Sequence, residues 1–142
     1  MAKPKTAVDL LAHVDLFAEL TPAELRKVAA LAKPMEFAAG EAVTEEGTAG
    51  GRFHLIESGR VKVVVGGRTR ATLGADDYFG ELSLIDGEPR SASVIAAEPL
   101  RTWSIAEWNF RPLLKTQGTI SYKLLVMLCQ RLRAEGKTNP AA

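Results

Sequence analysis

Residues 79 to 94 read Phe-Gly-Glu-Leu-Ser-Leu-Ile-Asp-Gly-Glu-Pro-Arg-Ser-Ala-Ser-Val, a composition typical of a phosphate-binding loop rather than of ordinary core. Gly80 lets the backbone come close to a ligand, and residues 81 to 85 are expected to form a short helix whose free N–H groups point back at that spot. Such a helix start attracts an anion. Arg90 adds a fixed cation with a planar donor fork, and Ser91 adds a hydroxyl. Together these groups suit one phosphodiester charge.

The segment resembles the signature of the cyclic-nucleotide-binding domains, which occur in bacterial transcription regulators, protein-kinase regulatory subunits and cyclic-nucleotide-gated channels. The resemblance rests on a long, ordered motif with a nine-residue step from Glu81 to Arg90. It implies that the glycine and the backbone amides after it hold the cyclic phosphate, that the glutamate takes the ribose 2′-hydroxyl and that the arginine binds the phosphate. The ligand-binding residues expected from it are Phe79, Gly80, Glu81, Leu82, Ser83, Arg90, Ser91 and Ala92.

Simpler roles exist for the charged members of this motif. Arg90 could form a surface salt bridge with Asp86 or Glu88, which are close in sequence. Glu81 could merely cap its own helix, because a carboxylate is favourable near a helix start. The surrounding motif favours the ligand-binding roles. Ser83 stands in Glu-Leu-Ser-Leu rather than in Gly-x-Ser-x-Gly, so a catalytic serine is not predicted.

Composition indicates one globular domain over residues 1 to 142. The chain is 46% hydrophobic and 25% charged, with a net charge of +1, and its length suits a single core. This charge balance gives no reason to expect direct nucleic-acid binding. Cys129 is the only cysteine, which excludes an intramolecular disulfide and a four-cysteine zinc site. We expect its thiol to be buried and inert.

A cytoplasmic location is expected. The apolar stretch after Lys3 and Lys5 is interrupted by charged residues, which a secretory signal does not tolerate. No apolar run approaches the ~20 residues of a membrane-spanning helix, so membrane insertion is not expected. His13 and His54 lack metal-ligand spacing, so we predict no metal or cofactor and assign them to packing positions.

The pattern of the chain predicts a mainly β fold with flanking helices. Residues 1 to 34 should form N-terminal helices, one of them opened by a capping box at Thr21 and Glu24 around Pro22. From residue 35 to 105, short β segments are punctuated by glycines. We expect an eight-stranded β-roll, or jelly roll, and the family resemblance implies the same fold.

Two tight turns fix the middle of this roll. Segments 53 to 57 and 60 to 65 should pair around Ser58-Gly59, and Gly66-Gly67 should lead into 68 to 73. Alternation along the second segment places Val61, Val63 and Val65 on one face. Segments 91 to 97 and 100 to 105 complete the roll.

Two C-terminal helices are expected over residues 106 to 135, followed by a tail at 136 to 142. Pro112 should interrupt or kink the first, and Trp103 and Trp108 should lie in the core. The second, from 119 to 133, is apolar around too much of its circumference for a surface helix. One face should pack on the roll and another should meet a ligand or partner. The ten or so residues after Leu132 are too few for a helix-turn-helix.

We therefore expect a non-enzymatic module that binds cyclic AMP or cyclic GMP and signals to a protein effector through the helix at 119 to 133, acting as a lid. Ser91 could reach a guanine amino group, as hydroxyls after the arginine do in some cyclic-GMP-preferring relatives, so the base preference stays open. One alternative is a domain of the same fold that has lost the nucleotide and serves as an interaction module. Another is a phosphodiester hydrolase, although the sequence offers neither a metal-ligand set nor a nucleophile–base pair.

Overall fold

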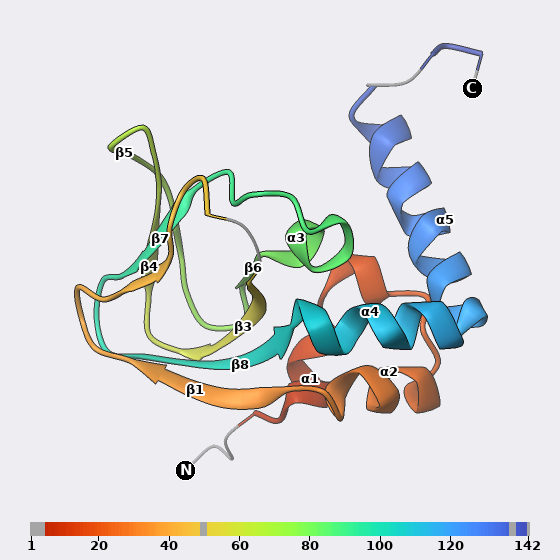
Figure 1. Ribbon diagram of the computed structural model, residues 1–142, viewed down its shortest axis with the longest axis horizontal. Helices are drawn as coiled ribbons and strands as arrows, with labels where there is room; N and C mark the ends of the chain where they lie inside the picture. Colours follow the sequence, from red (N-terminus) through yellow and green to blue (C-terminus); the bar gives the residue numbers. More distant parts are fainter. Residues whose placement is uncertain (1–4, 49–50, 137–138, 142) are drawn as a thin grey trace.

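The computed structural model describes residues 5–48, 51–136 and 139–141, and Figure 1 shows its helices gathered at one end of a β-roll. In chain order the elements are α1 (Ala7–Leu11), the 3-10 helix η1 (Asp15–Phe17), α2 (Pro22–Ala29), β1 (Lys33–Phe37), β2 (Ala42–Thr44), β3 (Arg52–Ser58), β4 (Val61–Val65), β5 (Arg68–Leu73), β6 (Tyr78–Phe79), α3 (Glu81–Asp86), β7 (Ser93–Ala96), β8 (Leu100–Ala106), α4 (Glu107–Thr116) and α5 (Gly118–Ala134).

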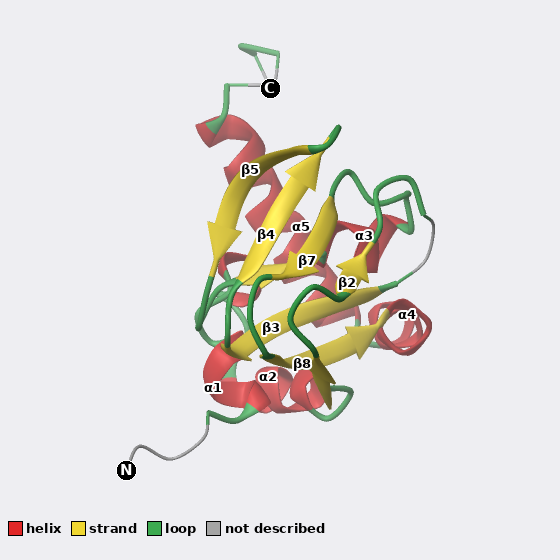
Figure 2. Ribbon diagram, turned by 90° about the vertical axis from the view of Figure 1, so that its left-hand side faces the viewer, coloured by secondary structure: helices red, strands yellow, loops and turns green. Residues whose placement is uncertain are grey.

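The described strands form two four-stranded antiparallel sheets. Their orders are β1-β8-β3-β6 and β2-β7-β4-β5, and the two sheets can be followed in Figure 2. In the first, Phe53 stands opposite Ile105; in the second, Lys62 stands opposite Thr72. These pairings confirm the expected eight-stranded roll, with helices before and after it in the sequence.

Buried apolar side chains form two clusters with different roles. The smaller cluster fills the roll itself and consists of Ile56, Val61, Phe79, Val94, Ala96 and Leu100. The larger cluster joins the roll to the helices. At its centre Phe17 meets both Phe53 and Phe110 edge to face, with ring centroids 6.1 Å apart in each pair. The helical end and the β-roll therefore share one continuous apolar contact.

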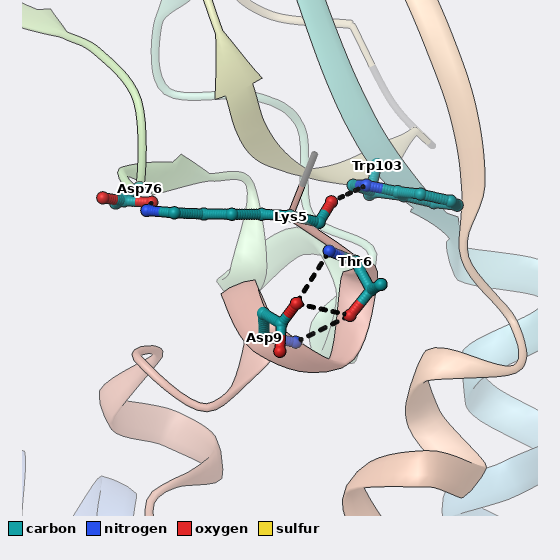
Figure 3. A network of polar contacts seen from close by, with 5 residues as sticks. All are labelled: Lys5, Thr6, Asp9, Asp76 and Trp103. Carbon is teal, nitrogen blue, oxygen red and sulfur yellow. Dashed lines mark hydrogen bonds and ion pairs between the residues drawn. The ribbon is translucent and has the colours of Figure 1, made fainter. Parts of the chain in front are cut away.

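Both N-terminal helices begin at capping boxes, which satisfy backbone N–H groups that have no partner within the helix. Thr21 and Glu24 form the predicted one at α2, and Thr6 and Asp9 form another at α1. The indole Nε1 of Trp103 donates to the Lys5 carbonyl at 3.1 Å, and the Lys5 ammonium pairs with Asp76 (Figure 3). These contacts fasten the start of α1 to β8 and to the turn before β6.

Several local expectations were wrong. β1 begins at Lys33, so the boundary at residue 34 falls inside a strand. α4 runs without interruption through Pro112, because an exposed proline removes a single helix hydrogen bond. Trp108 is 61% exposed rather than buried, and its ring instead lies 5.1 Å from the Arg52 guanidinium. Cys129 is exposed as well, because it lies on a side of α5 that packs against nothing buried.

The α5 helix packs mainly on other helices rather than on the strands. It begins at Gly118, and its buried Ile120 and Leu124 join the larger apolar cluster, while its main contacts are with η1 and α4. From there it extends away from α1, α2 and α4, as Figure 1 shows. Much of its apolar surface is left uncovered, including Leu125, which is 60% exposed. Within the described part of the chain, no helix combines the length and the apolar character needed to cross a membrane.

Candidate functional site

A cavity of about 280 Å³ lies where α3 and the segment after it meet the second sheet. All eight residues predicted to bind ligand line it: Phe79, Gly80, Glu81, Leu82, Ser83, Arg90, Ser91 and Ala92. The sequence analysis did not predict five further lining residues: Thr44, Val63, Leu73, Tyr78 and Val94. Strand alternation gave a usable signal for Val63, because it shares a strand face with the fully buried Val61. Tyr78 directly precedes the motif and Val94 is its last residue, whereas Thr44 and Leu73 come from more distant segments that only folding brings to the site.

Gly80 is required at the start of α3 for two reasons. Its backbone is left-handed, with φ at 88°, which side-chain-bearing residues adopt rarely. A Cβ at this position would also overlap the Arg90 Nη1 atom and approach the Arg52 carbonyl oxygen. The glycine therefore lets the arginine pass close beneath the helix start.

Arg90 is held by backbone groups on several sides. Its Nη1 donates to the Gly80 carbonyl at 3.3 Å, and its Nη2 donates to the Arg52 carbonyl. Its own N–H donates to the Thr48 carbonyl at 2.9 Å, and the Gly47 N–H donates to the Arg90 carbonyl at 2.8 Å. Only 7% of the residue is exposed. The guanidinium is thus fixed in the wall of the cavity.

The salt bridges weighed for Arg90 do not form. Among the described residues, no ion pair joins it to Asp86 or Glu88; the Asp86 carboxylate instead accepts the Glu88 N–H at 2.9 Å. Burial lowers the pKa of Arg90, whereas the charges of Glu107 and then Glu81 raise it. An arginine remains protonated under such influences. The cavity wall therefore carries a positive charge that no directly bonded carboxylate cancels.

His54 packs behind Phe79 and does not add to this charge. Its ring stacks on Phe79 with centroids 5.0 Å apart, and its Nδ1 lies 3.0 Å from the Thr102 hydroxyl. Burial, followed by the charges of Arg90 and Arg52, lowers the pKa of His54 to about 3. The imidazole is consequently neutral at physiological pH, in the packing role expected for it.

The α5 helix lies away from the cavity. None of its described residues lines that cavity, although its Leu124, Leu125 and Leu128 region was expected to cover the base. These leucines line a separate apolar groove of about 150 Å³, together with Ile85 and Leu114. Across the described residues, no group of three histidine, cysteine or acidic side chains is placed to hold a metal.

Comparison with known proteins identifies the family. Residues 34–117 match the model of the cyclic nucleotide-binding domain, which is more than half of the chain. The chain belongs to this family. It is 32% identical over 113 residues to a cAMP-dependent protein kinase regulatory subunit of Hypocrea atroviridis. It is also 32% identical over 130 residues to a CRP-like cAMP-activated global transcriptional regulator of Mycobacterium tuberculosis.

These relatives are longer proteins. The matched regions cover 80% and 88% of this chain, but 24% of the kinase subunit and 58% of the transcriptional regulator. A cGMP-dependent protein kinase of Plasmodium berghei is 34% identical over 70% of this chain, which is 12% of that protein. The cyclic nucleotide-binding domain is therefore one part of these relatives.

Solved structures share the fold. The N-terminal domain of a transcriptional regulator from Streptomyces coelicolor matches with a TM-score of 0.81 and 26% identity, covering 91% of this chain and 94% of that one. The catabolite activator protein of Thermus thermophilus matches with a TM-score of 0.68 and 29% identity, covering 87% and 60%. Both likenesses agree with the β-roll and helical end described above.

Proposed function

We propose that this cyclic nucleotide-binding domain binds cyclic AMP or cyclic GMP in the Arg90 cavity and reports occupancy to a protein partner through α5. The observation that carries the proposal is the buried Arg90 guanidinium in the wall of a cavity that the other seven motif residues also line. Buried charges are retained where they have a partner, and this one has only backbone carbonyls in direct contact. A bound phosphate supplies the missing anion.

Each part of a cyclic nucleotide has a complementary surface in the cavity. Arg90 and the amides at the start of α3 would hold the phosphate, and Glu81 would accept the ribose 2′-hydroxyl. Val63 and Leu73, from neighbouring strands of the second sheet, offer an apolar wall for the base. The mixture of one fixed charge, one acceptor and apolar walls is typical of small-ligand sites.

Cyclic AMP should bind at least as well as cyclic GMP. The Ser91 hydroxyl lies at the rim of the cavity, where it could meet a guanine amino group. One hydroxyl is the only feature that argues for guanine. Most relatives named above are proteins described as cAMP-dependent or cAMP-activated.

Signalling through α5 is supported by its uncovered apolar surface. Leu125 and Tyr122 are exposed by 60% and 68%, and the groove beside them reaches Ile85 of α3. Movement of α5 towards the filled cavity would cover this surface. The effector would then recognise the position of α5. A cytoplasmic location belongs to the same proposal, because a reducing compartment keeps the exposed Cys129 thiol free.

Equilibrium dialysis against cyclic AMP and cyclic GMP, followed by chromatography of the recovered nucleotide, tests the proposal. Retention of intact nucleotide at one site per chain is the expected result. Release of a linear 5′-monophosphate would indicate hydrolysis instead. Failure to retain either nucleotide would favour the same fold acting as an interaction module without a ligand.

A further inference from the structure

Two side chains of opposite charge each carry one buried atom without a hydrogen-bond partner among the described residues. These atoms are Nε of Arg90 and Oε2 of Glu107, the first residue of α4. The other carboxylate oxygen of Glu107 lies 3.3 Å from Nη1 of Arg111, one helical turn later. Buried polar atoms are nearly always bonded, so two such atoms of opposite charge call for an explanation.

Arg90 and Glu107 approach the same short backbone segment. A Cβ at Gly51 would overlap the Arg90 Nη2 atom, so the guanidinium lies directly against this glycine. The Gly51 carbonyl accepts the Glu107 N–H at 3.2 Å. The Arg52 carbonyl in turn accepts from Arg90, while the Arg52 side chain lies over Trp108. Residues 51 and 52 thus contact the arginine and the start of α4 at once.

Glu107 is also the carboxylate with the largest influence on the arginine. It raises the pKa of Arg90 more than Glu81 does, although Glu81 is only nine positions away in sequence. Positions 48 to 51 read Thr-Ala-Gly-Gly and contain no carboxylate. Glu107 therefore supplies negative charge to Arg90 from the helix rather than from that loop.

We propose that Glu107 is the internal counter-charge of Arg90, and that an anion bound in the cavity competes with it for the arginine. Glu107 is then a positioning residue for the phosphate site. The second half of the proposal rests on the proposed function, whereas the first half concerns the ligand-free protein alone.

The geometry gives this competition a consequence for α4. When an anion shares the charge of Arg90, Glu107 is free to pair more fully with Arg111. The Arg111 guanidinium lies against Gly87, the residue that caps the end of α3. Occupancy of the cavity would thereby alter the Glu107–Arg111 ion pair within α4, whose arginine lies against the end of α3.

A double-mutant cycle on the ligand-free protein tests the counter-charge. Glu107→Gln should lower the midpoint of thermal unfolding by roughly 4 °C, because a buried cation loses its compensating charge. In an Arg90→Met background the same substitution should lower the midpoint by about 1 °C at most, the loss of the Arg111 pair alone. Equal losses in the two backgrounds would overturn the proposal.

Nucleotide affinity is a second test, because replacing a residue with a purely structural role would not tighten the binding of cyclic AMP. Glu107→Gln should bind cyclic AMP about threefold to tenfold more tightly, because a like charge near the phosphate is removed. The matched control is Glu36→Gln on β1. It removes an equal charge, which is paired with Arg101 at 3.3 Å, and it should bind cyclic AMP like the parent. Unchanged or weaker binding in Glu107→Gln would contradict the competition.

The two readouts fail separately. If the parent binds no cyclic nucleotide, the proposed function falls, yet the unfolding cycle still decides the Arg90–Glu107 coupling. If the parent binds and the cycle shows no coupling, the counter-charge proposal alone is wrong. Should Arg90→Met not fold, the direction of the affinity change in Glu107→Gln decides.

Discussion

Arg90 is presented to the cavity by main-chain carbonyls rather than by acidic side chains. Carbonyl oxygens accept hydrogen bonds from its two terminal nitrogens and orient the guanidinium, but they carry no net charge. Glycines at positions 51 and 80 make room for this arrangement, because a side chain at either would meet the guanidinium. A cation so held keeps its attraction for an anion while its geometry is fixed in advance.

Glu81 provides a residue-scale prediction about the ribose. A 2′-deoxy cyclic nucleotide should bind the parent more weakly by ~1.5–3 kcal/mol, the usual value of a hydrogen bond to a charged group. In Glu81→Gln the penalty for removing the hydroxyl should shrink. Competition titrations with the two nucleotides on both proteins measure the difference. Equal penalties would show that Glu81 only caps α3.

His54 provides a prediction about pH. The unfolded chain takes up a proton at this histidine near pH 6.5, whereas the folded protein does so only near a pKa of about 3. The unfolded state therefore binds more protons between these values, and stability must fall as the pH drops, by ~1.4 kcal/mol per unit. Denaturant unfolding from pH 7 to pH 5 should show a loss of about 2 kcal/mol.

Substitution of the histidine supplies the control for this pH dependence. His54→Phe keeps an aromatic ring beside Phe79 and should flatten the dependence between pH 7 and pH 5. His13→Gln replaces the exposed histidine and should leave the pH dependence of stability unchanged. A slope that survives in His54→Phe would assign the proton uptake to another group.

At the scale of elements, α3 and α5 differ in how firmly they are placed. α3 begins at Gly80, ends at a left-handed Gly87 and buries Leu84 between the roll and the helices. α5 is nearly three times as long, with 17 residues against 6, yet buries only two side chains. Regions with few buried apolar contacts open most readily. Of these two helices, α5 is therefore the freer to move.

Amide exchange tests whether α5 moves when the cavity fills. With saturating cyclic AMP, exchange should slow by about tenfold both in residues 80–85 and in residues 124–132, because each segment gains contacts. Linear 5′-AMP at the same concentration is the control and should change neither. Slowing in residues 80–85 alone would mean that α5 stays in place and that the signal leaves by another route, such as α4.

Local sequence signals predicted those elements whose cause is local. The capping box at Thr21 and the Gly66-Gly67 turn were both recognised, because each depends on residues a few positions apart. The α5 helix was recognised by its apolar period, but its packing partner was not. The same spacing of apolar residues fits a helix packed on the strands and a helix packed on other helices. Only the contacts of α5 with η1 and α4 decide between the two arrangements.

At the scale of the whole molecule, the motif predicted eight residues that line one cavity but not the groups that surround them. Residues 79 to 94 contain all the polar groups assigned to the nucleotide. Glu107 and the carbonyl of Arg52 could not be found in that way, since 17 and 38 positions separate them from Arg90 and no local pattern links them. The contact between the exposed Trp108 ring and Arg52 could not be predicted either, because only the fold creates it.

The roll and the helical end together make an arrangement suited to a sensor. The cavity is built from both sheets and α3, and the larger apolar cluster joins this part of the roll to α1, η1, α4 and the first turns of α5. A ligand that alters α3 or Arg90 therefore acts at the junction between the roll and the helices. Packed side chains of this kind can carry energetic coupling between a site and a distant helix.

Calorimetric titration of cyclic AMP into the parent, Arg90→Ala and Arg70→Ala tests most directly whether the Arg90 cavity is the nucleotide site. Arg70 lies exposed on β5, outside the cavity lining, and its variant should bind like the parent. Arg90→Ala should lose ~2–4 kcal/mol of binding free energy, roughly 30-fold to 1000-fold in affinity, because the phosphate loses charged donors in a water-poor site. Binding by Arg90→Ala within threefold of the parent would contradict the account.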